Sequence, residues 1–187
     1  MIKAYNADPN DSGIIMHTAG FCSYLGKPSL AEPFYKKLLD IDPLSALNFL
    51  FEGFSLYFQG FFEKAIELLK KSSQIDPEFV YSIFWHPIFL AANNRKHEAL
   101  KLIDQIIKEG RMSEVFKELI LFIKYVLMGR KTKALNTLSD ETKKYTLNDP
   151  LFSGLMPGYF SLINEKDKAL DYLNHAINRG FINYPFF

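Results

Sequence analysis

The chain has 187 residues, of which 48% are hydrophobic and 16% aromatic. This composition excludes an intrinsically disordered protein, because disordered chains lack the apolar surface that a folded core requires. The formal net charge of +1, from 22 basic and 21 acidic residues, excludes an overall field that would attract nucleic acid or an anionic membrane.

Targeting signals and membrane spans are not evident in the sequence. The first nine residues lack the apolar stretch of a signal peptide. The apolar stretch 79–92 is too short for a span and contains His86-Pro87, while the stretch 116–128 carries three charged residues. The single cysteine, Cys22, excludes an internal disulfide and fits a reducing compartment. We therefore expect a cytoplasmic protein.

Three kinds of residue recur along the chain with one period. At a step of 34 residues these are Asp8-Pro9, Asp42-Pro43 and Asp76-Pro77; Gly26, Gly60 and Asn94; and Ala31, Ala65 and Ala99. At a step of 35 the pattern continues with Gly129 and Ala134, then with Asn164 and Ala169. A fixed period of this length is typical of repeat architectures, so the repeat decides how the rest is interpreted.

In chain order, the period predicts a partial helix over 1–9 and then five units near 12–45, 46–79, 80–113, 115–148 and 150–183. Each unit is expected to form two helices, the first densely apolar, as in 45–58, and the second with one apolar stripe, as in 63–72. A residue able to take positive φ, such as Gly60, is expected to end the first helix. The Asp-Pro pair is expected to end the second, because proline disfavours helix in the residue before it. The recurring alanines fit positions where two helices approach closely.

Both ends of the sequence suggest that the natural protein continues. In the repeat register Met1 corresponds to the middle of a second helix, and the chain stops at Phe186-Phe187 without a polar cap. Since a repeat unit cannot bury its face alone, we expect further chain at one or both ends, including any effector domain.

Period, turn glycine, second-helix alanine and terminal proline together resemble the tetratricopeptide repeat. The resemblance is closest over 46–79, where Gly53 and Ala65 match the family's small positions, and it weakens over 80–113, where Arg111 replaces the terminal proline. It implies an all-α, right-handed superhelical solenoid of about five helix-turn-helix hairpins forming a single domain over 1–187. Residues 165–185 also resemble the closing repeat of arrays in multidomain bacterial signalling proteins.

The same resemblance implies where a partner would bind. Family members use fixed positions of the first helices, which line the concave face. Carried over here, these positions give Leu50, Phe54, Tyr57, Phe58, Tyr81, Phe84, Ile88, Phe116, Leu119 and Ile123. Leu47 and Tyr81 each occupy the second position of their own unit.

The expected surface is aromatic and aliphatic, with almost no charge. It lacks the lysine and asparagine that related domains use to clamp chaperone carboxylates, and it suits an apolar or amphipathic helix of another protein. Three alternatives stay open. The side chains could pack as core, the groove could be filled intramolecularly, or the array could associate with a second copy through its groove or its ends.

The sequence offers little that would support catalysis. Cys22 and His17 lie five residues apart on one expected helix and therefore point in different directions. The other histidines show no metal-ligand spacing, and no glycine-rich phosphate loop is present. We therefore expect no enzyme activity, no cofactor, no metal and no nucleic-acid binding by this chain. The predicted function is that of a protein-interaction scaffold, as the docking or sensing region of a larger bacterial regulator.

Overall fold

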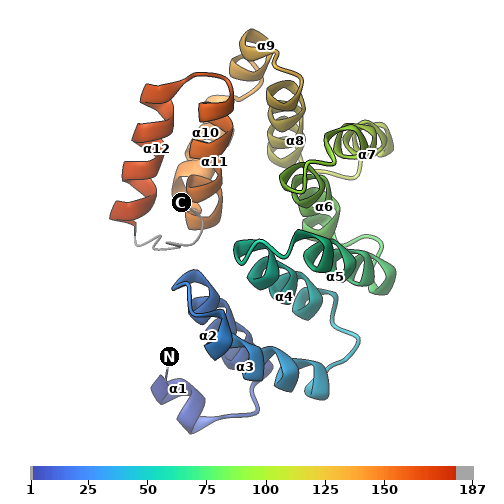
Figure 1. Cartoon of the computed structure of the whole chain (residues 1–187), viewed down its shortest axis with the longest axis vertical. Helices are drawn as coiled ribbons and strands as arrows, with labels where there is room; N and C mark the ends of the chain where they lie inside the picture. The colour runs from blue at the N-terminus through green and yellow to red at the C-terminus, as the bar shows by residue number, and fades with distance from the viewer. Residues whose placement is uncertain (1, 180–187) are drawn as a thin grey trace. The chain divides into compact units, whose positions relative to one another are not determined.

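The computed structural model describes residues 2–179, with side chains from residue 3, and this part of the chain is entirely helical (Figure 1). The helices are α1 (Ile2–Ala7), α2 (Ser12–Tyr24), α3 (Pro28–Ile41), α4 (Ala46–Phe58), α5 (Phe62–Ile75), α6 (Val80–Ala92), α7 (Lys96–Glu109), α8 (Glu114–Leu127), α9 (Lys131–Leu135), α10 (Asp140–Asn148), α11 (Pro150–Leu162) and α12 (Lys166–Asn178). Among these helices none combines the length and apolarity needed to cross a bilayer. The all-α prediction is confirmed.

The described residues fall into two compact units. The first unit contains α1 to α6, over residues 2–94, and the second contains α7 to α12, over residues 95–179. The interpretation of residues 1–187 as one five-unit array stays a prediction. The end of its last unit, 180–183, and the terminal Phe186-Phe187 lie outside the described residues.

The turns that close the first helices have the backbone conformation that the repeat predicts. Gly26, Gly60 and Gly129 have φ values of 66°, 81° and 70°, and Asn94 and Asn164 have 59° and 56°. A side chain is strained in this left-handed region, and glycine and asparagine tolerate it best. The turn at Gly60 is closed by a hydrogen bond of 2.9 Å, in which the Phe61 amide donates to the Leu56 carbonyl.

Helix starts and stops follow from local chemistry. Asp11 and Ser45 cap α2 and α4 by accepting a hydrogen bond from the backbone amide three residues on. The second helices α3 and α5 end immediately before Asp42-Pro43 and Asp76-Pro77, as expected. In the third expected unit, which lacks that proline, α7 ends instead at Gly110, which adopts a φ of 68°.

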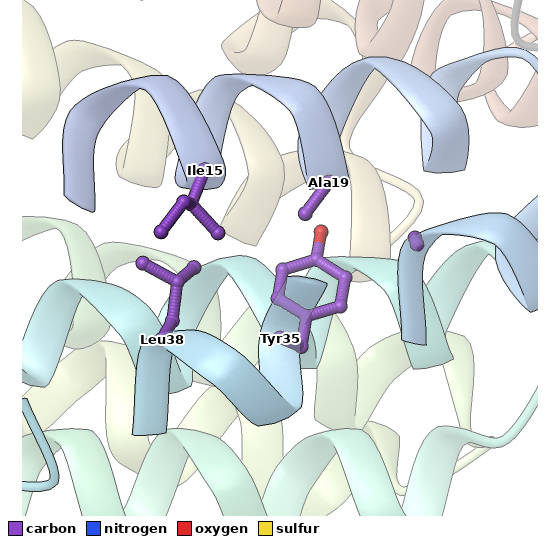
Figure 2. Packing of buried hydrophobic residues seen from close by; sticks show 5 residues of the cluster. Ile15, Ala19, Tyr35 and Leu38 are labelled. Atoms are coloured by element: carbon purple, nitrogen blue, oxygen red, sulfur yellow. The ribbon is translucent and has the colours of Figure 1, made fainter. Parts of the chain in front are cut away.

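Small residues allow the two helices of a hairpin to approach closely. Ala31 and Ala65 are fully buried, which confirms the close approach expected at these positions. Gly53 of α4 faces α5, and a Cβ atom built there would lie 2.8 Å from Leu69 Cδ1. In the α2–α3 hairpin, Figure 2 shows Ile15 facing Leu38 while the Tyr35 ring points from α3 toward α2.

The expected unit over 115–148 departs from the two-helix prediction, which is wrong there. Three helices occupy it, because the second helix stops after five residues at Leu135 and a new one starts at Asp140. Ser139 causes the restart, since its hydroxyl accepts from the Thr142 amide at 3.2 Å and its own amide donates to Glu118 Oε2 at 2.8 Å. These bonds favour a helix N-terminus where the repeat predicts a helix interior.

Candidate protein-docking site

Most of the side chains expected to bind a partner are buried in the structure. Seven of the ten have less than a tenth of their surface exposed: Leu50, Phe54, Phe58, Phe84, Ile88, Leu119 and Ile123. The other three, Tyr57, Tyr81 and Phe116, are accessible to different degrees. The docking assignment stays a prediction, and in this conformation only those three offer surface to a ligand.

The buried rings of the first unit form an aromatic cluster between α4 and α6. Phe54 lies at its centre, with ring centroids 4.8 Å from Trp85 and 5.6 Å from Phe89, both in edge-to-face geometry. Phe58 stacks beside Phe54 at 6.0 Å and contacts Tyr24 of α2 at 5.4 Å. Such pairs add stability beyond the burial of their area, so these rings hold the first helices of successive hairpins together.

The accessible rings lie at the margins of this packing. Tyr81 is 44% exposed, and Phe79 is its ring neighbour at 5.8 Å. Tyr57 stacks on Phe89 at 4.4 Å, and burial raises the pKa of its hydroxyl to about 12. In the second unit, Phe116 is half-buried beside Phe152 at 5.9 Å.

Leu47 of α4 is also accessible, with 37% of its surface exposed. Leu47, Tyr81 and Phe116 all occupy the second position of their expected units, in the first turn of a first helix. We refer to Leu47, Tyr57 and Tyr81, the accessible side chains at the expected binding positions of α4 and α6, as the first-unit surface. It is apolar except for the tyrosine hydroxyls.

A polar cavity of about 420 Å³ lies between α3 and α4 in the same unit. Tyr35 and Ser55 line it, and both of their hydroxyls contact Ser23, which donates to Ser55 at 2.9 Å and lies 3.3 Å from the Tyr35 hydroxyl. Glu52 also lines it, and burial, together with the nearby Glu32 carboxylate, raises the pKa of Glu52 although Lys71 opposes the shift. Sequence reasoning missed this cavity, because its walls come from helices whose spacing no local pattern specifies.

In the described part of the chain the cysteine thiol is not activated, and no cluster of metal ligands forms. Cys22 is half-buried on α2, and burial raises the pKa of its thiol, which disfavours the nucleophilic thiolate. Among residues 3–179, no three histidine, cysteine or acidic side chains lie close enough together to hold a metal ion. His175 is instead engaged with the Leu147 carbonyl at 2.8 Å.

Comparisons with known proteins support the fold. No family model matches the chain, and no curated protein matches it by sequence. Among solved structures, one described as YrrB, "a TPR protein with an unusual peptide-binding site", superposes with a TM-score of 0.54 at 15% identity, covering 99% of this chain and 94% of that one. A MamA protein superposes with a TM-score of 0.51 at 20% identity, covering 90% and 91%. A MamA double mutant gives 0.52 at 11% identity, covering 89% and 93%. The chain thus has a tetratricopeptide-repeat-like fold.

Proposed function

We propose that this protein is an interaction scaffold that docks an apolar or amphipathic helix of a partner protein on the first-unit surface. The observation that carries the proposal is the exposure of Leu47 and Tyr81 on helices whose other large apolar side chains are buried or half-buried. Exposed apolar side chains at equivalent positions of successive first helices offer a repeated anchor for one face of a helix. The likeness to YrrB, described as having a peptide-binding site, supports a peptide ligand.

The expected affinity is modest. Full burial of one large apolar side chain contributes about 1.5–3 kcal/mol, and these three side chains are already partly buried. Their total would therefore be about 3–6 kcal/mol. Association costs offset much of this, so micromolar binding requires further contacts from the same peptide. A transient docking role suits such a surface better than a permanent complex.

We also propose the wider setting predicted from the sequence. The resemblance of residues 165–185 to closing repeats of bacterial signalling proteins supports a docking or sensing region of a larger cytoplasmic regulator, in one array of five units. Residues 180–185 of that segment lie outside the described residues.

The proposal can be tested by selecting amphipathic helical peptides from a displayed library against the whole chain. The strongest peptide is then titrated against Leu47→Glu and Tyr81→Glu. The control is Leu30→Glu, since Leu30 is an apolar residue at least as solvent-accessible as these two but belongs to the second helix α3. We expect each of the first two variants to weaken binding at least tenfold and the control to leave it unchanged. Equal peptide binding by the parent and all three variants would show that the peptide does not dock on the first-unit surface.

A second candidate function is self-association, favoured by one observation on α12. Leu170 and Ile177 are 57% and 51% exposed, and with Leu173 they form an apolar stripe along the helix. The residues that correspond to Leu170 and Leu173 in α5, Ile66 and Leu69, are fully buried. Light scattering across a concentration series separates the two functions: a dimer that Leu170→Glu dissociates favours self-association, and a monomer at all concentrations favours docking.

A further inference from the structure

A second cavity, of about 390 Å³, lies within the second unit between α10 and α12. It adjoins the break between α9 and α10, where residues 136–139 replace the continuous second helix found in the other hairpins (Figure 1). Leu135 and Leu138 flank this break and line one side of the cavity. The irregularity of the fourth unit therefore coincides with a cavity that is partly open to solvent.

The cavity has apolar walls held in place by two hydrogen bonds. Leu147, Phe160 and Tyr172 complete its lining. The Tyr172 hydroxyl lies 2.9 Å from Thr146 Oγ1, and His175 Nε2 lies 2.8 Å from the Leu147 carbonyl, so both bonds join α12 to α10. Its size falls in the range of small-molecule sites, which are usually preformed and mainly apolar with a few polar groups.

The charged side chains that line the cavity have a positive balance. They are Lys143, Lys168 and Asp171. The Lys143 ammonium pairs with Asp140 at 2.9 Å, and the Lys168 ammonium pairs with Glu165 at 2.7 Å. In both pairs the carboxylate lies three residues before the lysine. The Lys143–Asp140 pair is exposed and contributes little, so a ligand anion can recruit the Lys143 ammonium at small cost. An ammonium group has several N–H donors, so Lys168 can bind an anion without releasing Glu165.

We propose that this cavity binds a small amphiphile that has an apolar body and a carboxylate head. The body occupies the space beside Leu138 and Tyr172, and the carboxylate accepts hydrogen bonds from Lys168 or Lys143. A cationic head would meet two ammonium groups and only one carboxylate, and a polar body would leave its hydrogen bonds unmet against the leucine walls. The site belongs to the second unit, shares no residue with the first-unit surface and does not depend on the proposed docking function.

The test compares three ligands of equal chain length, octanoate, octanol and octylamine, by calorimetric titration of the whole chain at pH 7. We expect one site, with octanoate bound most tightly and octylammonium least. Lys168→Gln should weaken octanoate about tenfold, as expected for the loss of a charge-assisted hydrogen bond, and leave octanol unchanged. Asp171→Asn should strengthen octanoate, because it removes the opposing charge.

The body of the ligand is tested by filling the cavity. Leu135→Phe and Leu147→Phe place extra atoms in the space, and at least one that retains the parent's helical circular dichroism should abolish binding of all three ligands. Leu170→Phe is the matched control, since Leu170 is on α12 but does not line the cavity, and binding should persist. Absence of octanoate binding to the parent, octylamine binding as tight as octanoate, or full binding by a folded cavity-filling variant would overturn the proposal.

Discussion

Phe54 provides the sharpest stability prediction, because its burial distinguishes a core ring from a docking ring. It is 6% exposed and touches Trp85 and Phe89 in edge-to-face geometry. Truncation of a buried phenylalanine to alanine costs about 3–5 kcal/mol, from lost transfer energy and the cavity that remains. An exposed ring would cost less than about 0.5 kcal/mol on the same change.

The assay is urea unfolding of Phe54→Ala and Tyr81→Ala, followed by the fluorescence of Trp85, the only tryptophan in the sequence. Because Trp85 contacts Phe54, the signal reports on the unit that carries the change. With a urea dependence of about 2 kcal/mol per molar, the midpoint of Phe54→Ala should fall by about 1.5–2.5 M. Tyr81→Ala should shift it by less than about 0.25 M. A Phe54→Ala midpoint within about 0.25 M of the parent, the shift allowed for an exposed ring, would refute the assignment of Phe54 to the core.

Three further predictions concern the turns and the carboxylates. Gly60→Ala should lower the free energy of unfolding by about 1–2 kcal/mol, because alanine is strained at a φ of 81°. Gly60→Asn should lower it by less. A higher melting temperature for Gly60→Ala than for Gly60→Asn would contradict this prediction. Glu52 has a raised pKa in the fold, so its ionised form is disfavoured there: Glu52→Gln should stabilise the protein at pH 7, and urea titrations should show the gain fading as the pH falls toward 4.5, the ordinary value for this carboxyl. The Lys131 and Lys168 ammonium groups hydrogen-bond Glu165 and lower its pKa to about 2, so Glu165→Gln should be less stable than the parent above pH 4.5. That difference should close as the pH falls toward 2, and a constant difference across this range would speak against the pairing.

The fold could be read from the sequence because its determinants are local. A glycine or asparagine at each turn needs only its own backbone preference, and Asp42-Pro43 ends a helix wherever it stands. Ala31 and Ala65 recur because each hairpin repeats one close approach. Because these signals recur with one period, an atypical residue in one unit can be interpreted from the residues at the same position in the other units.

The accessible surface could not be read in the same way. Positions 50, 54 and 58 carry apolar side chains that suit either a groove or a core, and the choice depends on how near the next helix lies. Phe54 is buried because Trp85 and Phe89 reach it from α6. Neither the composition nor the repeat period predicts how closely the side chains of α6 approach α4.

The second cavity escaped prediction for a related reason. Its origin is the restart of the helix at Ser139. In the repeat register Ser139 corresponds to the exposed Lys70 of α5, so in the sequence it resembles an ordinary surface residue. The bond from the Ser139 amide to Glu118, 21 residues away, favours the interruption together with the local cap on the Thr142 amide. Residue types at the repeat positions therefore predict the regular hairpins, whereas the interruption in the fourth unit depends on a hydrogen bond between residues distant in the sequence.

The docking claim is tested most directly by site-specific photocrosslinking. A photoreactive phenylalanine analogue replaces Tyr81 in one protein and Leu30 in another, and each is irradiated with the helical peptide selected against the parent chain. The proposed function predicts a covalent adduct at position 81 that excess unlabelled peptide suppresses, and none at position 30. An adduct at position 30 alone, or equal adducts at both positions, would contradict docking on the first-unit surface.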